Sequence, residues 1–169
     1  MRTLPDYLRK GMRLVLVGCN PGDRSARVGH YYAGRGNMFW PLLYESGIVP
    51  ELLAYQDDRR VLEFGIGLTD LVKRPSRAAE EIERREFAEG RVLLAQKLVE
   101  IQPRMVAFNG KMVFERFAGR PCNLGLQPTP LYGAQVFVLP STSGRNAGAA
   151  NGVKMRYFRQ LAELLRAAN

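Results

Sequence analysis

The side chains that could do chemistry are concentrated in short segments that follow expected β-strands or an expected glycine-rich turn. These segments cover residues 19–22, 69–70, 109–111 and 141–147. They provide amide, carboxylate and hydroxyl groups, which can hold a water molecule, accept a proton or bind a phosphate group. His30 is the single histidine of the 169 residues, so a mechanism that needs two histidines is excluded.

Alternating strands and helices must position these segments. Short apolar runs predict buried strands over residues 12–17, 104–108 and 135–139. Apolar residues at helical spacing predict helices over 37–46, 87–101, 110–117 and 153–167. A glycine-rich turn is expected over 65–69. The alternation predicts an α/β fold, a single three-layer α/β/α domain over residues 1–169 with a central, mostly parallel sheet. In such sheets ligands bind beyond the carboxyl ends of the strands.

The composition excludes several classes of protein. Cys19 and Cys122 cannot form a disulfide framework, and with one histidine they cannot complete an ordinary tetrahedral zinc site without carboxylates. We therefore expect neither a metal nor a cofactor. Apolar runs stay well short of the roughly 18 residues that span a bilayer, and residues 1–10 lack the apolar core of a signal peptide. The chain is expected to be a soluble, cytoplasmic protein that acts as a monomer.

The chain carries 25 Lys and Arg, 20 of them Arg, against 16 Asp and Glu, which gives a net charge of +9. Such an excess attracts polyanions, and the planar guanidinium group binds phosphate through paired hydrogen bonds. Nucleic acid is therefore the favoured partner class. An anionic membrane surface is disfavoured because the basic residues are scattered and form no amphipathic Lys-rich helix. A GC-rich genome is an alternative explanation for the ratio of Arg to Lys.

Asn20 follows the first expected strand and precedes a Pro-Gly turn. The surrounding residues 18–25 have the wrong glycine spacing for a phosphate-binding P-loop and lack its lysine. At a strand end, the Asn20 amide could hold a water through its carbonyl oxygen or donate to the carbonyl of a base. Alternatively, Asn20 caps the local backbone in an Asx-type turn.

The segment 29–37 places three consecutive rings, those of His30, Tyr31 and Tyr32, between glycines, with a cation and an amide after them. Aromatic faces stack on nucleobases, which contributes roughly 1–3 kcal/mol per base. Alternatively, the rings pack the loop onto the core.

The two remaining loops offer acid and hydroxyl groups. Asp70 could orient water or stabilise positive charge that develops on a substrate. Alternatively, it pairs with Lys73 or Arg74, or caps a helix that starts at Leu71. The segment 140–148 places three hydroxyl residues before Gly, Arg and Asn, a composition suited to contacts with a phosphate backbone. Alternatively, this segment is a flexible linker to the last helix.

Together these loops resemble the mismatch-specific uracil/thymine DNA glycosylases, a branch of the uracil-DNA glycosylase superfamily. Residues 18–22 are similar to the Gly-x-Asn-Pro-Gly first motif, and 29–40 to the aromatic loop that leads into Asn-x-Phe-Trp. Residues 65–72 and 102–111 match segments between the motifs. Residues 139–147 are similar to the second motif of the thymine DNA glycosylases, Pro-Ser-Ser-Ser-Ala-Arg, whereas bacterial members usually carry Asn-Pro-Ser-Gly-Leu.

The resemblance implies a role for each matching residue. Asn20 would position the attacking water, Tyr32 would stack on the flipped base, and Asn37 would contact that base. The base pocket would be completed by Cys19, Pro21, Gly22 and Thr69. The residues expected to contact DNA are His30, Lys111, Ser141, Thr142, Ser143, Gly144, Arg145 and Asn146. Among these, Ser143 would anchor a phosphate and Arg145 would fill the gap that the flipped nucleotide leaves.

The expected activity is DNA repair: hydrolysis of the N-glycosidic bond of uracil, thymine or a modified pyrimidine in mismatched duplex DNA, chiefly opposite guanine. Asp70 stands where many relatives have Lys or Asn, and we expect it to act as a second catalytic group beside Asn20. The main alternative is a non-catalytic module that binds damaged DNA on the same scaffold. A nucleoside hydrolase is a further rival, which the charge and the wedge-like loop oppose.

Overall fold

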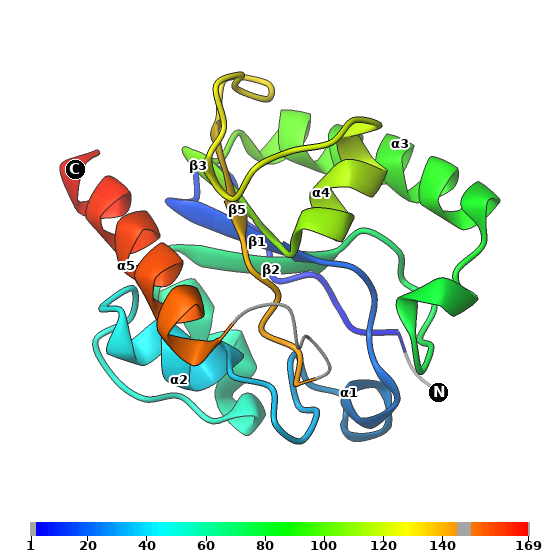
Figure 1. Cartoon of the computed structure of the whole chain (residues 1–169), viewed down its shortest axis with the longest axis horizontal. Helices are drawn as coiled ribbons and strands as arrows, with labels where there is room; N and C mark the ends of the chain where they lie inside the picture. Colours follow the sequence, from blue (N-terminus) through cyan, green and yellow to red (C-terminus); the bar gives the residue numbers. More distant parts are fainter. Residues whose placement is uncertain (1–2, 145–149, 169) are drawn as a thin grey trace.

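A five-stranded sheet forms the centre of the computed structural model, which describes residues 3–144 and 150–168 (Figure 1). The strands lie in the order β2-β1-β3-β5-β4, and all neighbours are parallel except β4, which runs antiparallel to β5. Their bounds are Leu14–Gly18 for β1, Ile66–Asp70 for β2, Met105–Asn109 for β3, Gly125–Leu126 for β4 and Gln135–Leu139 for β5. The carboxyl ends of the four parallel strands therefore meet at one edge of the sheet.

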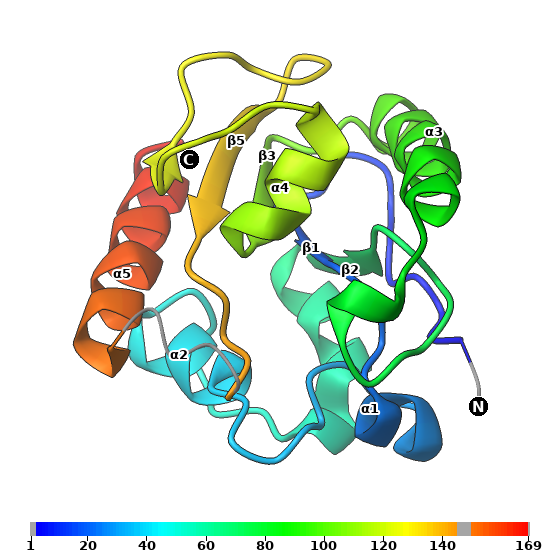
Figure 2. The same cartoon turned by 45° about the vertical axis from the view of Figure 1, so that its right-hand side comes forward.

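Helices cover both faces of this sheet (Figures 1 and 2). The α-helices are α1 (Asp23–Val28), α2 (Phe39–Glu45), α3 (Arg84–Ile101), α4 (Lys111–Ala118) and α5 (Asn151–Ala167), and the 3-10 helices are η1 (Tyr55–Phe64) and η2 (Ala79–Glu81). Helices α3 and α4 pack on one face, and α2, η1 and α5 pack on the other. The expected α/β fold with a central, mostly parallel sheet is confirmed.

Alternation along the buried strands divides the core into two parts. Leu14 and Leu16 of β1 face α2 and α5, whereas Val15 and Val17 face α3 and α4. All four side chains are fully buried, and each such burial stabilises the fold by about 1.5–3 kcal/mol. Because both faces of β1 are covered, its sequence is a continuous apolar run rather than an alternating one.

One expected turn is a strand. Only Gly65 of residues 65–69 turns the chain, with a φ of 72°, and Ile66–Asp70 form β2. Residue 67 lies inside this strand and is a glycine because a Cβ there would come within 2.7 Å of the carbonyl oxygen of Tyr7. The N-terminal segment pairs with the edge of β2 at this point. The second glycine therefore reflects a close approach of two backbones and not a turn.

The other expected strands and helices are present, with shifted ends. Helix α1, the edge strand β4 and the 3-10 helices η1 and η2 were not predicted, because such short elements carry little periodicity in the sequence. Within residues 3–144 and 150–168, none of the helices combines the length and apolar character needed to cross a membrane.

Gly90 lies where α3 crosses the end of β2. A Cβ at Gly90 would come within 2.2 Å of the carbonyl oxygen of Leu71, so a side chain there must push the helix and the strand apart. We expect Gly90→Ala to lower the free energy of unfolding by about 1–3 kcal/mol, as overpacking typically does. Urea unfolding measures this, with Gly152→Ala as the control, since a Cβ at that helical glycine meets nothing within 4 Å. Equal effects of the two substitutions would contradict the explanation.

Candidate active site

A cleft of about 1100 Å³ opens at the carboxyl ends of the parallel strands. Its walls come from the segments that follow β1, β2, β3 and β5 and from the loop between α1 and α2. Of the residues that the sequence assigns to a site, the cleft is lined by Cys19, Asn20, Pro21, Gly22, Tyr32, Asn37, Asp70, Lys111, Ser141, Thr142, Ser143 and Gly144. The topology thus gathers both sequence motifs around one hollow.

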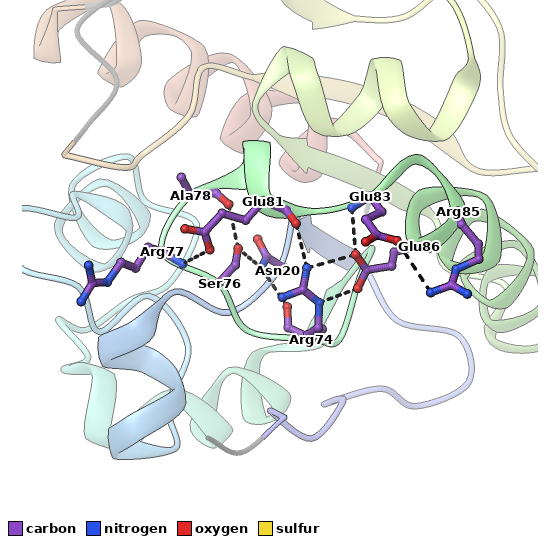
Figure 3. Close-up of polar contacts among 9 residues, drawn as sticks. All are labelled: Asn20, Arg74, Ser76, Arg77, Ala78, Glu81, Glu83, Arg85 and Glu86. Atoms are coloured by element: carbon purple, nitrogen blue, oxygen red, sulfur yellow. Dashed lines mark hydrogen bonds and ion pairs between the residues drawn. The ribbon is translucent and has the colours of Figure 1, made fainter.

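Asn20 is half-buried directly after β1. Its Nδ2 donates to the carbonyl oxygen of Arg74 and to Oγ of Ser76, each at 2.8 Å (Figure 3). Its Oδ1 has no hydrogen-bond partner among the described residues, so it can accept from a water or a base. The side chain bonds a segment far along the chain and none of its own turn, so the alternative of an Asx-type turn does not apply.

Asp70 ends β2 opposite Gly18 of β1. Its side chain is buried, and its Oδ2 has no hydrogen-bond partner in the described structure. Gly18 provides the room, since a Cβ there would lie 2.8 Å from Oδ1 of Asp70 and 3.0 Å from the hydroxyl of Tyr32. Burial raises the pKa of Asp70 to about 7 against the opposing charge of Lys73. The carboxyl group is therefore about half ionised at neutral pH.

The alternative roles of Asp70 are not found. Lys73 forms an ion pair with Asp6 at 2.5 Å, and Arg74 binds Glu86 through two hydrogen bonds. No helix follows β2 directly, so Asp70 does not act as a helix cap. None of the ion pairs described near Asp70 involves its carboxylate, so ion pairing does not explain why Asp70 is buried in the cleft.

Tyr32 adopts a left-handed backbone conformation with a φ of 54°. Its ring stacks on Phe39 with a centroid distance of 3.9 Å and an interplanar angle of 19°. The hydroxyl group is buried without a partner among the described residues, and burial together with the charge of Asp70 raises its pKa. A base that stacks on Tyr32 must therefore use the ring face away from Phe39.

The loop that carries Tyr32 is fixed by side chains that bond its backbone. Asp58 accepts a hydrogen bond from the N–H of Tyr31 at 2.9 Å, and Ser25 accepts one from the N–H of Ala33 at 3.0 Å. Tyr31 is itself buried in the core. Both tyrosines border the cleft, but Tyr31 is buried in the core whereas Tyr32 is only half-buried, so both interpretations of the aromatic run apply.

His30 and Thr69 are not among the residues that line the cleft, and for Thr69 this differs from the expected place in the base pocket. Nδ1 of His30 lies 3.1 Å from Oδ1 of the buried Asp58, so the imidazole supports the aromatic loop. Thr69 precedes Asp70 on β2, and successive strand residues face opposite sides of a sheet. Its hydroxyl donates to Asp6 at 2.7 Å, away from the cleft. The assignment of Thr69 to the base pocket is therefore corrected, whereas the contact of His30 with DNA stays a prediction.

Asn37 and Cys19 also line the cleft. Oδ1 of Asn37 accepts from the N–H of Phe39 at 3.0 Å, which leaves Nδ2 without a partner among the described residues. That nitrogen can donate to a carbonyl oxygen of a base. Burial and the charge of Asp70 raise the pKa of the Cys19 thiol to about 12, so this thiol stays protonated and is no nucleophile at neutral pH.

The loop after β5 is braced against the end of β3. Nδ2 of Asn109 donates to Oγ1 of Thr142 at 2.9 Å, and the N–H of Thr142 donates to Oδ1 of Asn109 at 3.0 Å. Thr142 is buried, so its hydroxyl anchors the loop and is not exposed to a phosphate. The N–H of Ser143 donates to Oγ of Ser141 at 3.2 Å. Through residue 144 this segment is a braced loop and not a flexible linker.

Basic side chains stand at the rim of the cleft. Lys111 is the first residue of α4. Arg27 lies in α1, and Arg35 lies in the loop after α1. All three are exposed, and none forms an ion pair with another residue that the structure describes. Arg145 and Asn146, expected to contact DNA, lie outside the described residues.

Sequence reasoning gave no role to Ser76, Asn109 or Arg35, although Asn109 lies in one of the segments expected to follow a strand. Asn109 carried a usable signal, because it ends β3 at the same edge as Asn20 and Asp70. Ser76 carried none, because its role depends on a tertiary contact with Asn20. Across residues 3–144 and 150–168, His, Cys, Asp and Glu side chains nowhere gather in a group of three or more that could hold a metal ion.

Comparison with known proteins supports the superfamily to which the expected branch belongs. The family model described as the uracil DNA glycosylase superfamily matches residues 5–166. The fold is similar to the solution NMR structure of a Methanosarcina acetivorans protein provisionally assigned as a uracil DNA glycosylase, with a TM-score of 0.64, 24% identity and 98% coverage of both chains. At this identity the structure supports the fold, whereas the family model spans nearly the whole sequence. This chain therefore belongs to the uracil DNA glycosylase superfamily.

Proposed function

We propose that the protein is a monofunctional DNA glycosylase that excises uracil from mismatched duplex DNA, chiefly opposite guanine, and leaves an abasic site. Membership of the superfamily supports the class of reaction. The observation that carries the proposal is the environment of Asn20, because the protein binds its amide nitrogen and leaves its carbonyl oxygen for a water in the cleft. Thymine and modified pyrimidines are further candidate substrates.

The target bond is inaccessible inside a stacked duplex, so the nucleotide must rotate out of the helix. Extrusion costs a few kcal/mol and costs least at a mismatch, which favours uracil opposite guanine over uracil opposite adenine. Tyr32 offers one ring face to the extruded base. Ser143 and Arg145 are proposed to hold the opened duplex, by binding a phosphate and by filling the gap respectively.

Cleavage of the glycosidic bond leaves positive charge on the sugar and negative charge on the departing pyrimidine. Hydrogen-bond donors stabilise that negative charge, and Nδ2 of Asn37 is a donor in the cleft that has no partner among the described residues. The backbone N–H of Gly22 is a second candidate donor. A water held by Oδ1 of Asn20 then adds to the sugar carbon.

Asp70 supplies what Asn20 lacks, a group that can take a proton. An amide oxygen orients a water but is a very weak base, whereas a carboxylate with a pKa near the working pH is an effective general base. With a pKa of about 7, Asp70 fits that requirement. Its carboxylate also stabilises the cationic sugar by charge attraction.

A duplex that contains one G:U mismatch tests the proposal. We expect the protein to convert the uridine to an abasic site, so that alkali then breaks that strand at that position. Free deoxyuridine should remain intact. Tight binding of the duplex without a strand break would favour the non-catalytic alternative, and cleavage of free deoxyuridine alone would favour a nucleoside hydrolase.

The exposed cations of the rim predict a measurable salt dependence. We expect Lys111→Ala and Arg35→Ala each to weaken binding of the G:U duplex and to reduce the slope of log K against log[salt] by about 1, because each loses one phosphate contact. Fluorescence anisotropy titrations at several salt concentrations measure the slope. Arg159→Ala removes an exposed cation from α5, outside the cleft, and should leave the slope unchanged. If all three variants had the same slope as the unsubstituted protein, the proposed path of DNA along Lys111 and Arg35 would be contradicted.

A further inference from the structure

The orientation of the Asn20 amide decides whether it can serve the proposed reaction. An asparagine side chain carries an oxygen and a nitrogen of similar size, and a half-turn about its last bond exchanges them. Only the oxygen accepts a hydrogen bond from water and directs a water lone pair toward the substrate. Some feature of the protein must therefore prevent the exchange.

Two groups beside the Asn20 side chain can accept a hydrogen bond from its amide but cannot donate one to it. The carbonyl oxygen of Arg74 has no hydrogen to offer. The hydroxyl of Ser76 has one, but it is directed to the carbonyl oxygen of Ala78 at 2.8 Å (Figure 3). Because both partners of the amide can only accept, the nitrogen of Asn20 must face them. The oxygen is then forced to the opposite side.

The loop that carries these acceptors is itself anchored. The guanidinium of Arg74 binds both oxygens of Glu86, and its Nη2 donates to the carbonyl oxygen of Glu81 at 2.8 Å. Glu86 lies in the first turn of α3 and also accepts from the N–H of Glu83, as part of a capping box. The N–H of Ser76 donates to the carbonyl oxygen of Pro21 at 3.1 Å. The loop is thus tied both to α3 and to the turn that follows Asn20.

We propose that Ser76 is a positioning residue that sets the orientation of the Asn20 amide, with the carbonyl oxygen of Arg74 as its partner. This inference rests on the proposed function of Asn20. Ser76 is buried and acts on the substrate only through Asn20, so it should affect the chemical step and not the binding of DNA. The Ser76 hydroxyl donates its proton to the carbonyl oxygen of Ala78. Its oxygen can therefore only accept the hydrogen bond from Nδ2 of Asn20.

The test compares serine variants in single-turnover release of uracil from a G:U duplex. We expect Ser76→Ala to lower the rate constant about 10- to 100-fold, the cost of a misplaced reacting group, with the Kd for the duplex unchanged. Ser76→Thr keeps the hydroxyl and should recover most of the rate, and Ser76→Cys serves if threonine does not fit. Ser46→Ala is the matched control, because that buried serine also donates to a backbone carbonyl, that of Leu43, but lies outside the cleft.

A double variant separates positioning from a general loss of structure. If Ser76 acts through Asn20, then Asn20→Ala with Ser76→Ala should be no slower than Asn20→Ala alone. In addition, NMR should show slow hydrogen exchange of the Asn20 side-chain amide, which Ser76→Ala accelerates and Ser46→Ala does not. A full rate in Ser76→Ala, or losses that multiply in the double variant, would overturn the inference. If the unsubstituted protein releases no uracil, the proposed function fails, and the amide exchange still tests the contact.

Discussion

Asn20→Ala is expected to lower the single-turnover rate of uracil release from a G:U duplex by about 100- to 1,000-fold, as loss of an active-site hydrogen-bonding group typically does. The substitution removes the side-chain oxygen after β1 that has no partner among the described residues and is proposed to hold the attacking water. The amide makes its two described hydrogen bonds only with Arg74 and Ser76, so the fold should survive its loss. Binding of the duplex should change little, because contacts with the DNA backbone are unaffected.

The control for Asn20→Ala is Gln160→Ala, which removes an exposed amide from α5, outside the cleft. That variant should keep the full rate. Circular dichroism and urea unfolding establish that both variants are folded. A rate for Asn20→Ala within a few-fold of the unsubstituted protein would mean that the water is held elsewhere, and the proposed mechanism would be lost.

The position of the site was predictable because parallel topology restricts where polar residues can meet. Strands at 12–17, 104–108 and 135–139 are visible as apolar runs bounded by Gly or Pro, and their carboxyl ends must share one edge of the sheet. Asn20 was placed by that argument, whereas Asp70 followed an expected turn that proved to be strand β2. The resemblance of the two motifs then gave the class of reaction.

Finer assignments failed where a side chain's direction depends on tertiary contacts. Thr69 and Asp70 are adjacent in sequence, yet one bonds Asp6 and the other enters the cleft, because the strand continues through residue 70. Because a turn was expected over residues 65–69, the alternation of Thr69 and Asp70 between the two faces of the sheet was not predicted. The contact of His30 with Asp58 was not predicted, because Asp58 lies in a 3-10 helix that no pattern predicted.

Asp70→Asn is expected to stabilise the protein at alkaline pH. The pKa of Asp70 is about 7 in the folded protein against 3.8 as its ordinary value. The unfolded chain therefore releases this proton at lower pH than the folded protein, and the free energy of unfolding falls as pH rises from about 4 to 7. Asparagine does not ionise, so the stability of the variant relative to the unsubstituted protein should rise by about 2–3 kcal/mol between pH 5 and pH 8. Urea unfolding at the two pH values measures the difference.

The same substitution should abolish most of the activity, and the two effects have one cause. A carboxyl group that is costly to ionise in this cleft is also a base whose pKa lies at the working pH. The single-turnover rate of the unsubstituted protein should therefore rise with pH and level off above about 7, with a tenfold fall per unit well below it. Asp70→Asn should be slow and nearly independent of pH over that range. If Asp70→Asn kept the full rate while gaining stability, the carboxylate would be a buried charge without a catalytic role, and Asn20 alone would direct the water.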